Sequence, residues 1–362
     1  VSFQHELALP EASESALRYL RQTVAHATLC TRSPSAGPVH LNVPFRDPLP
    51  PVPDDGTTER FAAGMSWEVF FAHLEPVESP QMAAVLPRII PEVHGVIVVG
   101  PAQPGDVGAY VTAVAEVARR LGWPVLADGL SPLRNYASQF PHLVTTYDLV
   151  LRNAPIAERL KPVVVLCLGG WPTSKVLRGW LEESGARTWL ITERADNRDA
   201  LQLRTRQIAI SLPLLASILP VAVDENGYQR MWARYDAKAR AALDEKFRNQ
   251  PVLFEPKAAW LLARHLPSGT SIFVANSMPA RDVEYVWPPG ERALRPLCNR
   301  GANGIDGTLS TALGIAHGAE VPAVLLTGDL ALLHDSNGFL LRPKFRGSLT
   351  IVLINNRGGG IF

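Results

Sequence analysis

The amino-acid sequence predicts an α/β fold built from doubly wound parallel sheets. Short runs rich in Val, Ile and Leu end at Gly or Asn, as the buried strands of parallel sheets do. Helical stretches separate these runs, and that alternation is typical of parallel sheets covered by helices. The chain has 362 residues, a length that suits two or three domains. We therefore expect more than one α/β domain.

The first segment, residues 1–52, is expected to hold a helix over about 13–28 and a strand over 39–45. The strand runs directly into a proline-rich exit. Residues 53–90 carry many prolines and acidic residues. We predict a linker there, with one amphipathic piece near 67–74.

The central segment, residues 91–250, shows the alternation most clearly. Its expected strands and helices, in chain order, are strand 96–100, helix 107–121, strand 124–127, strand 162–168, helix 173–183 and strand 188–191. This order predicts a parallel, doubly wound central domain that is Rossmann-like. A charged, Ala-rich stretch over 224–248 follows. It predicts an exposed helix that links this domain to the next.

A third unit spans residues 251–362. Its expected elements are helix 255–266, strand 271–274, strand 294–297, helix 307–317, strand 321–326 and strand 349–353. The chain starts at Val1 without Met and stops just after a strand and a Gly-rich turn. We therefore expect a fragment of a longer protein, with a last domain that is incomplete at its C-terminus.

Composition excludes several classes of function. The formal net charge of +1, with 19% charged and 47% hydrophobic residues, argues against a broad nucleic-acid surface. The three cysteines are scattered without a C-x-x-C pair, which favours free thiols in a reducing compartment. No apolar stretch is long enough for a membrane span and no signal peptide is visible. We expect a cytoplasmic protein that recognises small molecules.

Two polar residues follow buried strands near the end of the chain. Asp329 and Asn356 are 27 positions apart (356 − 329 = 27), about one strand–helix–strand unit. Ligands of open α/β sheets bind at such carboxyl ends. The two side chains and the nearby carbonyl of Gly358 are hard oxygen donors, which suit Mg²⁺. The pattern predicts these three as metal ligands of a diphosphate site. The alternative is that Asp329 caps a helix and Asn356 shapes a turn.

Four sequence blocks then appear in order, at 276–281, 299–307, 328–330 and 358–362. The set resembles the 2-succinyl-5-enolpyruvyl-6-hydroxy-3-cyclohexene-1-carboxylate synthase family of menaquinone and phylloquinone biosynthesis, whose cofactor is thiamine diphosphate. The resemblance covers the whole chain and is most specific after about Leu253. It implies that residues 1–52 are the tail of the pyrimidine-binding domain. Residues 251–362 would be the diphosphate-binding domain.

The resemblance also implies which residues bind thiamine diphosphate and its Mg²⁺, for which Mn²⁺ can substitute. Leu330 departs from the pattern of thiamine diphosphate enzymes, which have Gly there. Ile305 is expected to hold the cofactor in a bent form that brings its amino group near the reactive carbon. It could equally anchor its own loop. The implied cofactor residues are Gly328, Asp329, Leu330, Asn303, Ile305, Asn356, Gly358, Ile361 and Phe362.

The family's substrates, 2-oxoglutarate and isochorismate, carry several carboxylates. Arg281 and Arg300 match positions suited to bind them, since guanidinium groups bind carboxylates through two hydrogen bonds. Ser277 is expected to contact a reaction intermediate, to cap the following helix, or both. Lys175 is a further candidate from the central domain, although Val176 stands where some relatives have a second basic residue. Each cation could instead be a solvated surface residue.

The implied reaction is decarboxylation of 2-oxoglutarate followed by conjugate addition of the resulting carbanion to isochorismate, a transfer that forms a C–C bond. In the family, a Glu that activates the cofactor lies upstream of this segment. Each site lies between two subunits of a dimer or dimer of dimers. We therefore expect these 362 residues to be inactive alone.

Three other functions remain to be weighed. Another thiamine diphosphate enzyme, of the acetolactate synthase or 2-keto acid decarboxylase type, shares the metal-binding pattern. A non-catalytic relative could bind metal and diphosphate only. A nucleotide-binding domain is disfavoured because the turn after the first central strand, residues 100–104, is rich in proline and lacks G-x-G-x-x-G.

Overall fold

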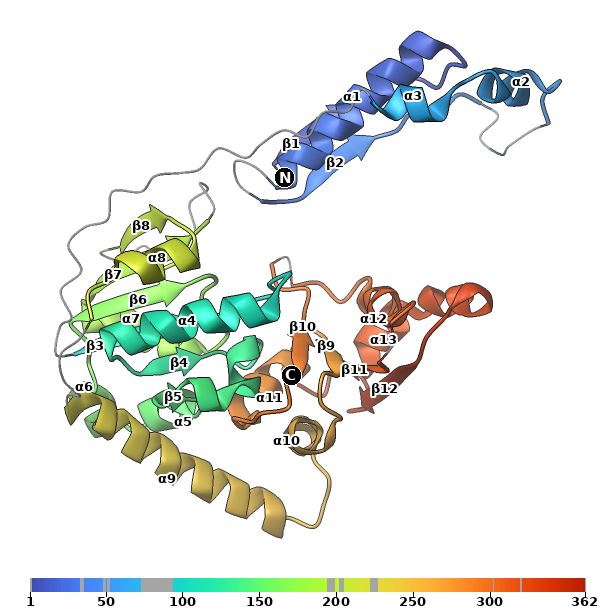
Figure 1. Ribbon diagram of the computed structural model, residues 1–362. Helices are drawn as coiled ribbons and strands as arrows, with labels where there is room; N and C mark the ends of the chain where they lie inside the picture. Colours follow the sequence, from blue (N-terminus) through green and yellow to red (C-terminus); the bar gives the residue numbers. More distant parts are fainter. Residues whose placement is uncertain are drawn as a thin grey trace. The chain divides into compact units, whose positions relative to one another are not determined.

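The computed structural model describes residues 2–32, 36–47, 50, 53–72, 94–193, 199–201, 205–221, 227–301, 303–319 and 321–361. The chain divides into two compact units, Val1–Ala84 with Glu193–Asn197 and Val85–Thr192 with Arg198–Phe362. Figure 1 shows the elements of each unit. The finer division into four segments stays a prediction.

The first unit pairs two parallel strands, with its first helix packed against them. Its elements are β1 Phe3–Glu6, α1 Glu14–Cys30, β2 Val39–Asn42, α2 Thr57–Ala63 and α3 Trp67–Ala72. Ser13 caps α1 by accepting a hydrogen bond from the Ala16 N–H. The Arg21 guanidinium of α1 lies 4.6 Å from the ring centroid of Phe70 in α3. Part of the predicted linker therefore folds as two helices, and its residues 73–90 lie outside the described chain.

The second unit contains a six-stranded parallel sheet. Its strands are β3 Gly95–Val99, β4 Val125–Ala127, β5 Leu143–Val144, β6 Val164–Leu168, β7 Arg187–Thr192 and β8 Thr205–Ala209. The spatial order is β5-β4-β3-β6-β7-β8, the doubly wound arrangement that the sequence predicts. Strands β5 and β8 were not predicted, because β5 is two residues long and β8 contains Arg and Gln.

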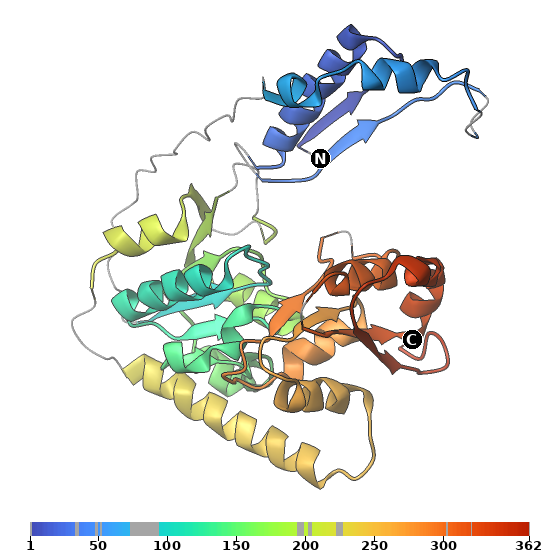
Figure 2. The same cartoon turned by 45° about the vertical axis from the view of Figure 1, so that its right-hand side comes forward.

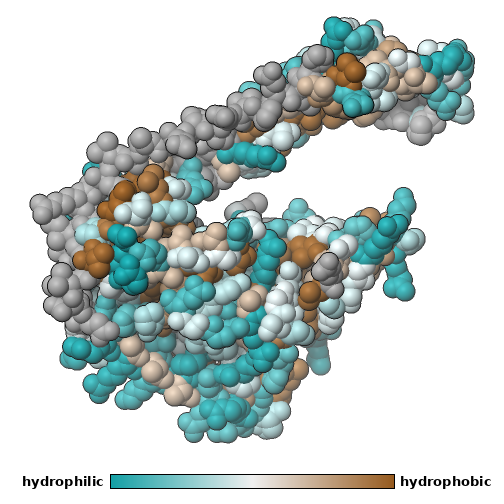
Figure 3. Space-filling view, viewed as in Figure 1, coloured by the Kyte–Doolittle hydropathy of each residue, from teal (hydrophilic) through white to brown (hydrophobic). Residues whose placement is uncertain are grey.

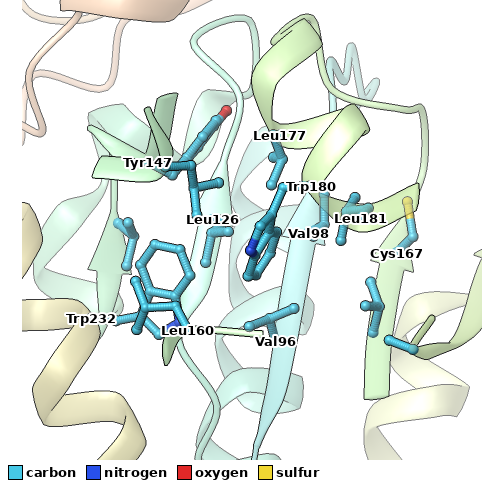
Figure 4. Close-up of a cluster of buried hydrophobic side chains, with 14 of the residues drawn as sticks. Val96, Val98, Leu126, Tyr147, Leu160, Cys167, Leu177, Trp180, Leu181 and Trp232 are labelled. Carbon is cyan, nitrogen blue, oxygen red and sulfur yellow. The ribbon is translucent and has the colours of Figure 1, made fainter. Parts of the chain in front are cut away.

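Helices cover both faces of this sheet. They are α4 Val107–Leu121, η1 Pro132–Asn135, η2 Ala137–Gln139, α5 Tyr147–Leu151, α6 Ala154–Arg159, α7 Lys175–Ser184 and α8 Leu212–Ile218. Figure 4 shows part of the core beside β3 and β4, where Val98 and Leu126 pack with Trp180 and Trp232. These side chains are buried, so the sheet is a rigid support for the loops at its strand ends.

The long helix α9 Gly227–Asn249 confirms the prediction of a linking helix. Figures 1 and 2 show it running from the six-stranded layer toward α10. The expectation of an exposed helix is wrong for one face. Tyr228 and Trp232 are buried in the core of the six-stranded layer, and Phe247 is buried in the next core. The outward face is mostly hydrophilic in Figure 3. Alanine and charge content concealed this amphipathic pattern in the sequence.

A second parallel sheet of four strands completes this unit. Its elements are α10 Glu255–His265, β9 Ser271–Val274, α11 Met278–Val286, β10 Arg295–Leu297, α12 Thr308–Ala316, β11 Ala323–Gly328, α13 Asp329–His334, η3 Ser336–Lys344 and β12 Leu349–Ile354. The order is β10-β9-β11-β12. The direction of strand succession reverses between β9 and β11, so the sheet has a topological switch point there.

Candidate functional site

Backbone strain gathers at the carboxyl ends of the four-stranded sheet. Among the described residues, four that are not glycine have a positive φ. Three of them follow these strands: Ser277 after β9 (φ 72°), Asn303 after β10 (φ 58°) and Arg357 after β12 (φ 65°). Left-handed backbone is costly for residues with a side chain, and such strain clusters at functional sites. This edge of the sheet is therefore the candidate site.

Asp329 meets the glycine turn that follows β12. Strands β11 and β12 are adjacent and place Gly328 opposite Ile354. One Asp329 oxygen accepts a hydrogen bond from the Gly358 N–H at 2.8 Å, and the other accepts from the Leu330 N–H at 2.8 Å. The predicted neighbourhood of the two strand ends is thus confirmed. Asp329 is the first residue of α13, and Gly328 occupies the N-cap position instead.

Asn356 shapes the same turn. Its side-chain oxygen accepts a hydrogen bond from the Gly360 N–H at 3.3 Å, and Asn355 accepts one from the Arg357 N–H at 2.9 Å. The turn function considered for Asn356 is therefore present. Gly358 and Gly359 both have positive φ, 79° and 66°, which glycine adopts without strain.

The donor chemistry of this turn fits a hard cation. Asp329 and Asn356 are half-buried and offer a carboxylate and an amide oxygen, which suit Mg²⁺ better than soft metals. No group of three or more His, Cys, Asp or Glu that could hold a metal occurs among the described residues. A cation here would therefore need amide, backbone or phosphate oxygens as well. The metal assignment of Asp329, Asn356 and Gly358 stays a prediction.

A buried asparagine organises the loop that follows β10. Asn276 is 5% exposed and lies two residues beyond the end of β9. Its amide donates hydrogen bonds to the carbonyls of Asn299 (2.9 Å) and Gly304 (2.7 Å). Its oxygen accepts one from Arg300 at 3.3 Å. Asn276 thereby brings Arg300 to the switch point. Sequence reasoning missed its function, because its partners lie 23 to 28 positions away.

The same loop carries three residues predicted for the site. Arg300 and Asn303 are exposed, and Ile305 is half-buried. The Ile305 carbonyl accepts a hydrogen bond from the Thr308 hydroxyl at 2.8 Å, so its position is tied to the start of α12. Gly304 is exposed, and its carbonyl accepts the 2.7 Å hydrogen bond from the Asn276 amide. Gly304 and Ile305 are therefore tied by hydrogen bonds to the end of β9 and to the start of α12.

Ser277 and Arg281 lie at the beginning of α11. Ser277 is half-buried and makes no side-chain capping hydrogen bond to the helix. The alternative that it caps the helix is therefore not supported. Arg281 is exposed, and its Nη1 lies 3.5 Å from the sulfur of Met278. Both side chains remain available to a ligand at the switch point.

The remaining predicted residues lie nearer the surface. Lys175 is exposed at the start of α7, where it lines a cavity of about 360 Å³ with Arg152 and Lys161. Within the described chain, no hydrogen bond or ion pair joins Lys175 to the loops of the four-stranded sheet. Leu330 and Ile361 are 48% and 40% exposed. Phe362 lies outside the described residues.

Known proteins are similar to this chain in sequence or in fold. Residues 75–274 match the family described as "Middle domain of thiamine pyrophosphate". The chain belongs to this thiamine pyrophosphate enzyme family. A putative thiamin diphosphate-dependent enzyme from Mycobacterium smegmatis aligns with a TM-score of 0.55 over 98% of this chain and 65% of that chain. At 17% identity, that likeness concerns the fold alone.

Closer relatives of this thiamine pyrophosphate family member are named 2-succinyl-5-enolpyruvyl-6-hydroxy-3-cyclohexene-1-carboxylate synthase. Those from Microcystis aeruginosa and Nostoc are each 47% identical over 100% of this chain, and that from Acaryochloris marina is 47% identical over 99%. The chain spans 63% of the length of each. The resemblance stated from sequence blocks is thereby confirmed.

Proposed function

We propose that the whole protein is the thiamine diphosphate-dependent synthase that decarboxylates 2-oxoglutarate and joins the product to isochorismate. The reaction forms 2-succinyl-5-enolpyruvyl-6-hydroxy-3-cyclohexene-1-carboxylate. The identity of 47% to proteins of that name supports the proposal. The observation that carries it is the meeting of Asp329 with the glycine turn, beside a loop that Asn276 holds in place.

The cofactor's diphosphate would bind where β11 and β12 end. Asp329 and Asn356, with the Gly358 carbonyl, would hold Mg²⁺, or Mn²⁺ in its place. The cation offsets the negative charge of the diphosphate. Bound thiamine diphosphate would supply stabilisation of the carbanion left after loss of CO₂. Ile305, with Leu330 and Ile361, would provide an apolar surface that excludes water from the cofactor.

The substrates would be recognised by cations that surround the switch point. Arg300 and Arg281 are exposed there and can bind carboxylates through paired hydrogen bonds. Ser277 has a hydroxyl without a capping partner and would bind a polar group of the substrate. Lys175 would contribute charge from the central domain. Substrates that carry several carboxylates match this set better than pyruvate does.

We infer that a Glu elsewhere in the whole protein would activate the cofactor, and that the complete site would form between subunits of a homo-oligomer. We propose the cytoplasm as its location. No helix among the described residues has both the length and the apolar character to cross a membrane.

The full-length protein with Mg²⁺ and thiamine diphosphate tests this proposal. We expect CO₂ release from 2-oxoglutarate, and formation of the adduct only when isochorismate is also present. Pyruvate should be turned over poorly. Efficient pyruvate turnover without reaction of 2-oxoglutarate would instead support an acetolactate synthase or 2-keto acid decarboxylase. Cofactor binding without turnover of either acid would support a non-catalytic relative.

A further inference from the structure

A buried polar network joins the two sheets of the second unit. Its centre is Glu284, whose side chain is fully buried in α11. One carboxylate oxygen accepts hydrogen bonds from the Gly129 N–H at 2.6 Å and from Arg134 at 3.2 Å. The other accepts from the Tyr147 hydroxyl. Gly129 follows β4, Arg134 is in η1 and Tyr147 begins α5. One side chain of the four-stranded layer thus contacts three elements of the six-stranded layer.

The end of α11 is bound equally firmly through its backbone. Arg134 is fully buried and donates to the carbonyls of Glu284 (2.9 Å) and Trp287 (3.0 Å). Arg240 of α9 donates to the Val286 carbonyl at 3.0 Å. Two cations therefore satisfy the free carbonyls at the C-terminus of this helix, where the helix dipole favours positive charge.

The two layers also touch without intervening side chains. A Cβ at Gly129 would lie 2.6 Å from the Val283 carbonyl oxygen and 2.7 Å from the Glu284 Cα. This backbone contact leaves little freedom for α11 to slide or rotate. The helix has nine residues, and Ser277 lies about 10 Å from Glu284 at the usual rise per residue. A change in the helix position at Glu284 is therefore transmitted to Ser277 and Arg281.

The network extends to the turn that carries Lys175. Asp128 is fully buried after β4. Its two oxygens accept hydrogen bonds from the Leu130 N–H at 2.8 Å and from the Thr173 N–H at 2.6 Å. Ser174, which caps α7, donates to Asp148 at 2.5 Å. The turn before Lys175 and the end of α11 are thus attached to the same strand end, that of β4.

Burying this much charge is not the simplest way to stabilise an interface. Glu284 and Arg134 form a fully buried ion pair, and a second buried carboxyl, Asp128, lies nearby. Apolar residues of similar volume often stabilise a core equally well. Burial and the nearby Asp128 raise the pKa of Glu284 to about 8, and burial raises the pKa of Asp128. Hydrogen bonds are directional, so this network fixes the orientation of α11 against the six-stranded layer.

We propose that Glu284 is a positioning residue. Through Gly129, Arg134 and Tyr147 it sets where α11 begins, and so holds Ser277 and Arg281 in a fixed place at the carboxyl end of β9. The kinetic part of this inference rests on the proposed function. The structural part, that the start of α11 depends on Glu284, stands on the hydrogen bonds alone.

The experiment compares Glu284→Leu with the conservative Glu284→Gln in the full-length protein at pH 7. We expect the Leu variant to raise the KM for the carboxylated substrates about tenfold or more, with thiamine diphosphate affinity unchanged. Glu284→Gln keeps the shape of the side chain and one acceptor oxygen, so its KM should stay close to that of the wild-type protein. Tyr147→Phe removes only the hydroxyl that donates to Glu284. This variant replaces Glu284→Leu in the experiment if the Leu variant does not fold.

The matched control is Asp236→Asn. Asp236 is another buried carboxylate, and it accepts hydrogen bonds from the Thr145 and Thr146 N–H groups at 2.8 and 2.7 Å. It should lower the melting temperature without changing the KM. An equal KM change in this control, or an unchanged KM in Glu284→Leu and Tyr147→Phe, would overturn the kinetic inference.

Amide hydrogen exchange of residues 277–282 provides a readout that needs no activity. We expect faster exchange there in Glu284→Leu than in Asp236→Asn. If the wild-type protein lacks synthase activity but this difference appears, the proposed function fails and the positioning inference stands. If exchange of this segment is unchanged in both Glu284→Leu and Tyr147→Phe, the positioning inference fails whatever the reaction.

Discussion

The backbone N–H of Gly358 donates a 2.8 Å hydrogen bond to the Asp329 carboxylate across the ends of two neighbouring strands. This contact identifies Asp329 as the residue that joins the glycine turn to β11. Replacing Asp329 by Ala should abolish Mg²⁺-dependent binding of thiamine diphosphate, because the carboxylate supplies the only formal charge among the proposed ligands. Titration calorimetry with and without Mg²⁺ measures this.

The control for Asp329→Ala is Asp335→Asn, just beyond the other end of α13. Asp335 accepts hydrogen bonds from the N–H and hydroxyl of Ser310 at 2.6 and 3.0 Å. Its loss should reduce stability and leave the Mg²⁺ dependence intact. Unchanged cofactor affinity in Asp329→Ala would refute the ligand assignment.

Asn276→Leu should release the loop after β10. The variant loses two donated hydrogen bonds and leaves the carbonyls of Asn299 and Gly304 without that partner. We expect a loss of about 1–3 kcal/mol in the free energy of unfolding, and faster proteolysis within residues 299–304. Asn276→Asp keeps the acceptor for Arg300 and should be intermediate. Proteolysis at the wild-type rate in the Leu variant would contradict the importance of this contact.

Arg300→Ala should raise the KM for a carboxylated substrate far more than the dissociation constant of the cofactor. The reason is that a guanidinium recognises carboxylate oxygens directly. Arg295→Ala, an exposed arginine of β10, is the matched control and should change neither constant. Equal effects of Arg300→Ala on substrate and cofactor would place Arg300 outside the substrate pocket.

We predict that the free energy of unfolding depends on pH through the ionisation of Asp282. This residue is 2% exposed, and its Oδ1 has no hydrogen-bond partner among the described residues. Burial, with the charge of Glu255, raises the pKa of this carboxyl from 3.8 to about 7. The pKa is higher in the folded state than in the unfolded state, so the protonated carboxyl contributes to the free energy of unfolding. This contribution is fully present below pH 3.8 and is lost as the pH rises through about 7.

Asp282→Asn removes this ionisation, so it should stabilise the protein more at pH 8 than at pH 5. The difference scales at about 1.4 kcal/mol per unit of pKa shift. Urea unfolding at both pH values measures it. Asp244→Asn is the control. Asp244 pairs with Arg264 at 2.7 Å, so the loss of this ion pair should destabilise the protein at both pH values. Equal effects of Asp282→Asn at the two pH values would contradict the raised pKa.

Gly129→Ala tests the contact between the two sheets. The added methyl group would lie 2.6 Å from the Val283 carbonyl oxygen, so α11 must move. We expect a loss of about 1–3 kcal/mol in the free energy of unfolding. Gly105→Ala, where no atom lies within 4 Å of the new Cβ, should be nearly neutral. Similar melting temperatures for both variants would show that the interface tolerates the displacement.

The strands that form apolar runs were predictable from sequence, since β3, β6 and β11 are buried on both faces of their sheets. Strands β5 and β8 were not, because a two-residue strand has no period and a partly exposed strand has no continuous apolar run. Helix α9 was found, but its buried face depends on packing against two cores.

The candidate site divides in the same way. The positions of Asp329 and Asn356 at neighbouring strand ends were predictable, because each residue follows its own apolar strand. The organising function of Asn276 and the burial of Glu284 were not, since their partners come from distant loops. Glu284 lies 155 positions from Gly129, and no local pattern marks a helical Glu as buried. Spacing along the sequence can place residues at the edge of a sheet. The residues that orient them are identified only by contacts in the folded protein.

The Asp329–Gly358 hydrogen bond has a thermodynamic consequence for metal loading. Both Asp329 oxygens already accept one backbone hydrogen bond each, and each keeps a further lone pair, so a cation at the proposed site would bind a carboxylate that the turn already orients. Less free energy would then be lost in ordering this ligand when the cation binds. Substitutions at Gly359, which has φ 66° and supplies no proposed ligand atom, would therefore weaken cation binding by straining the turn that orients Asp329.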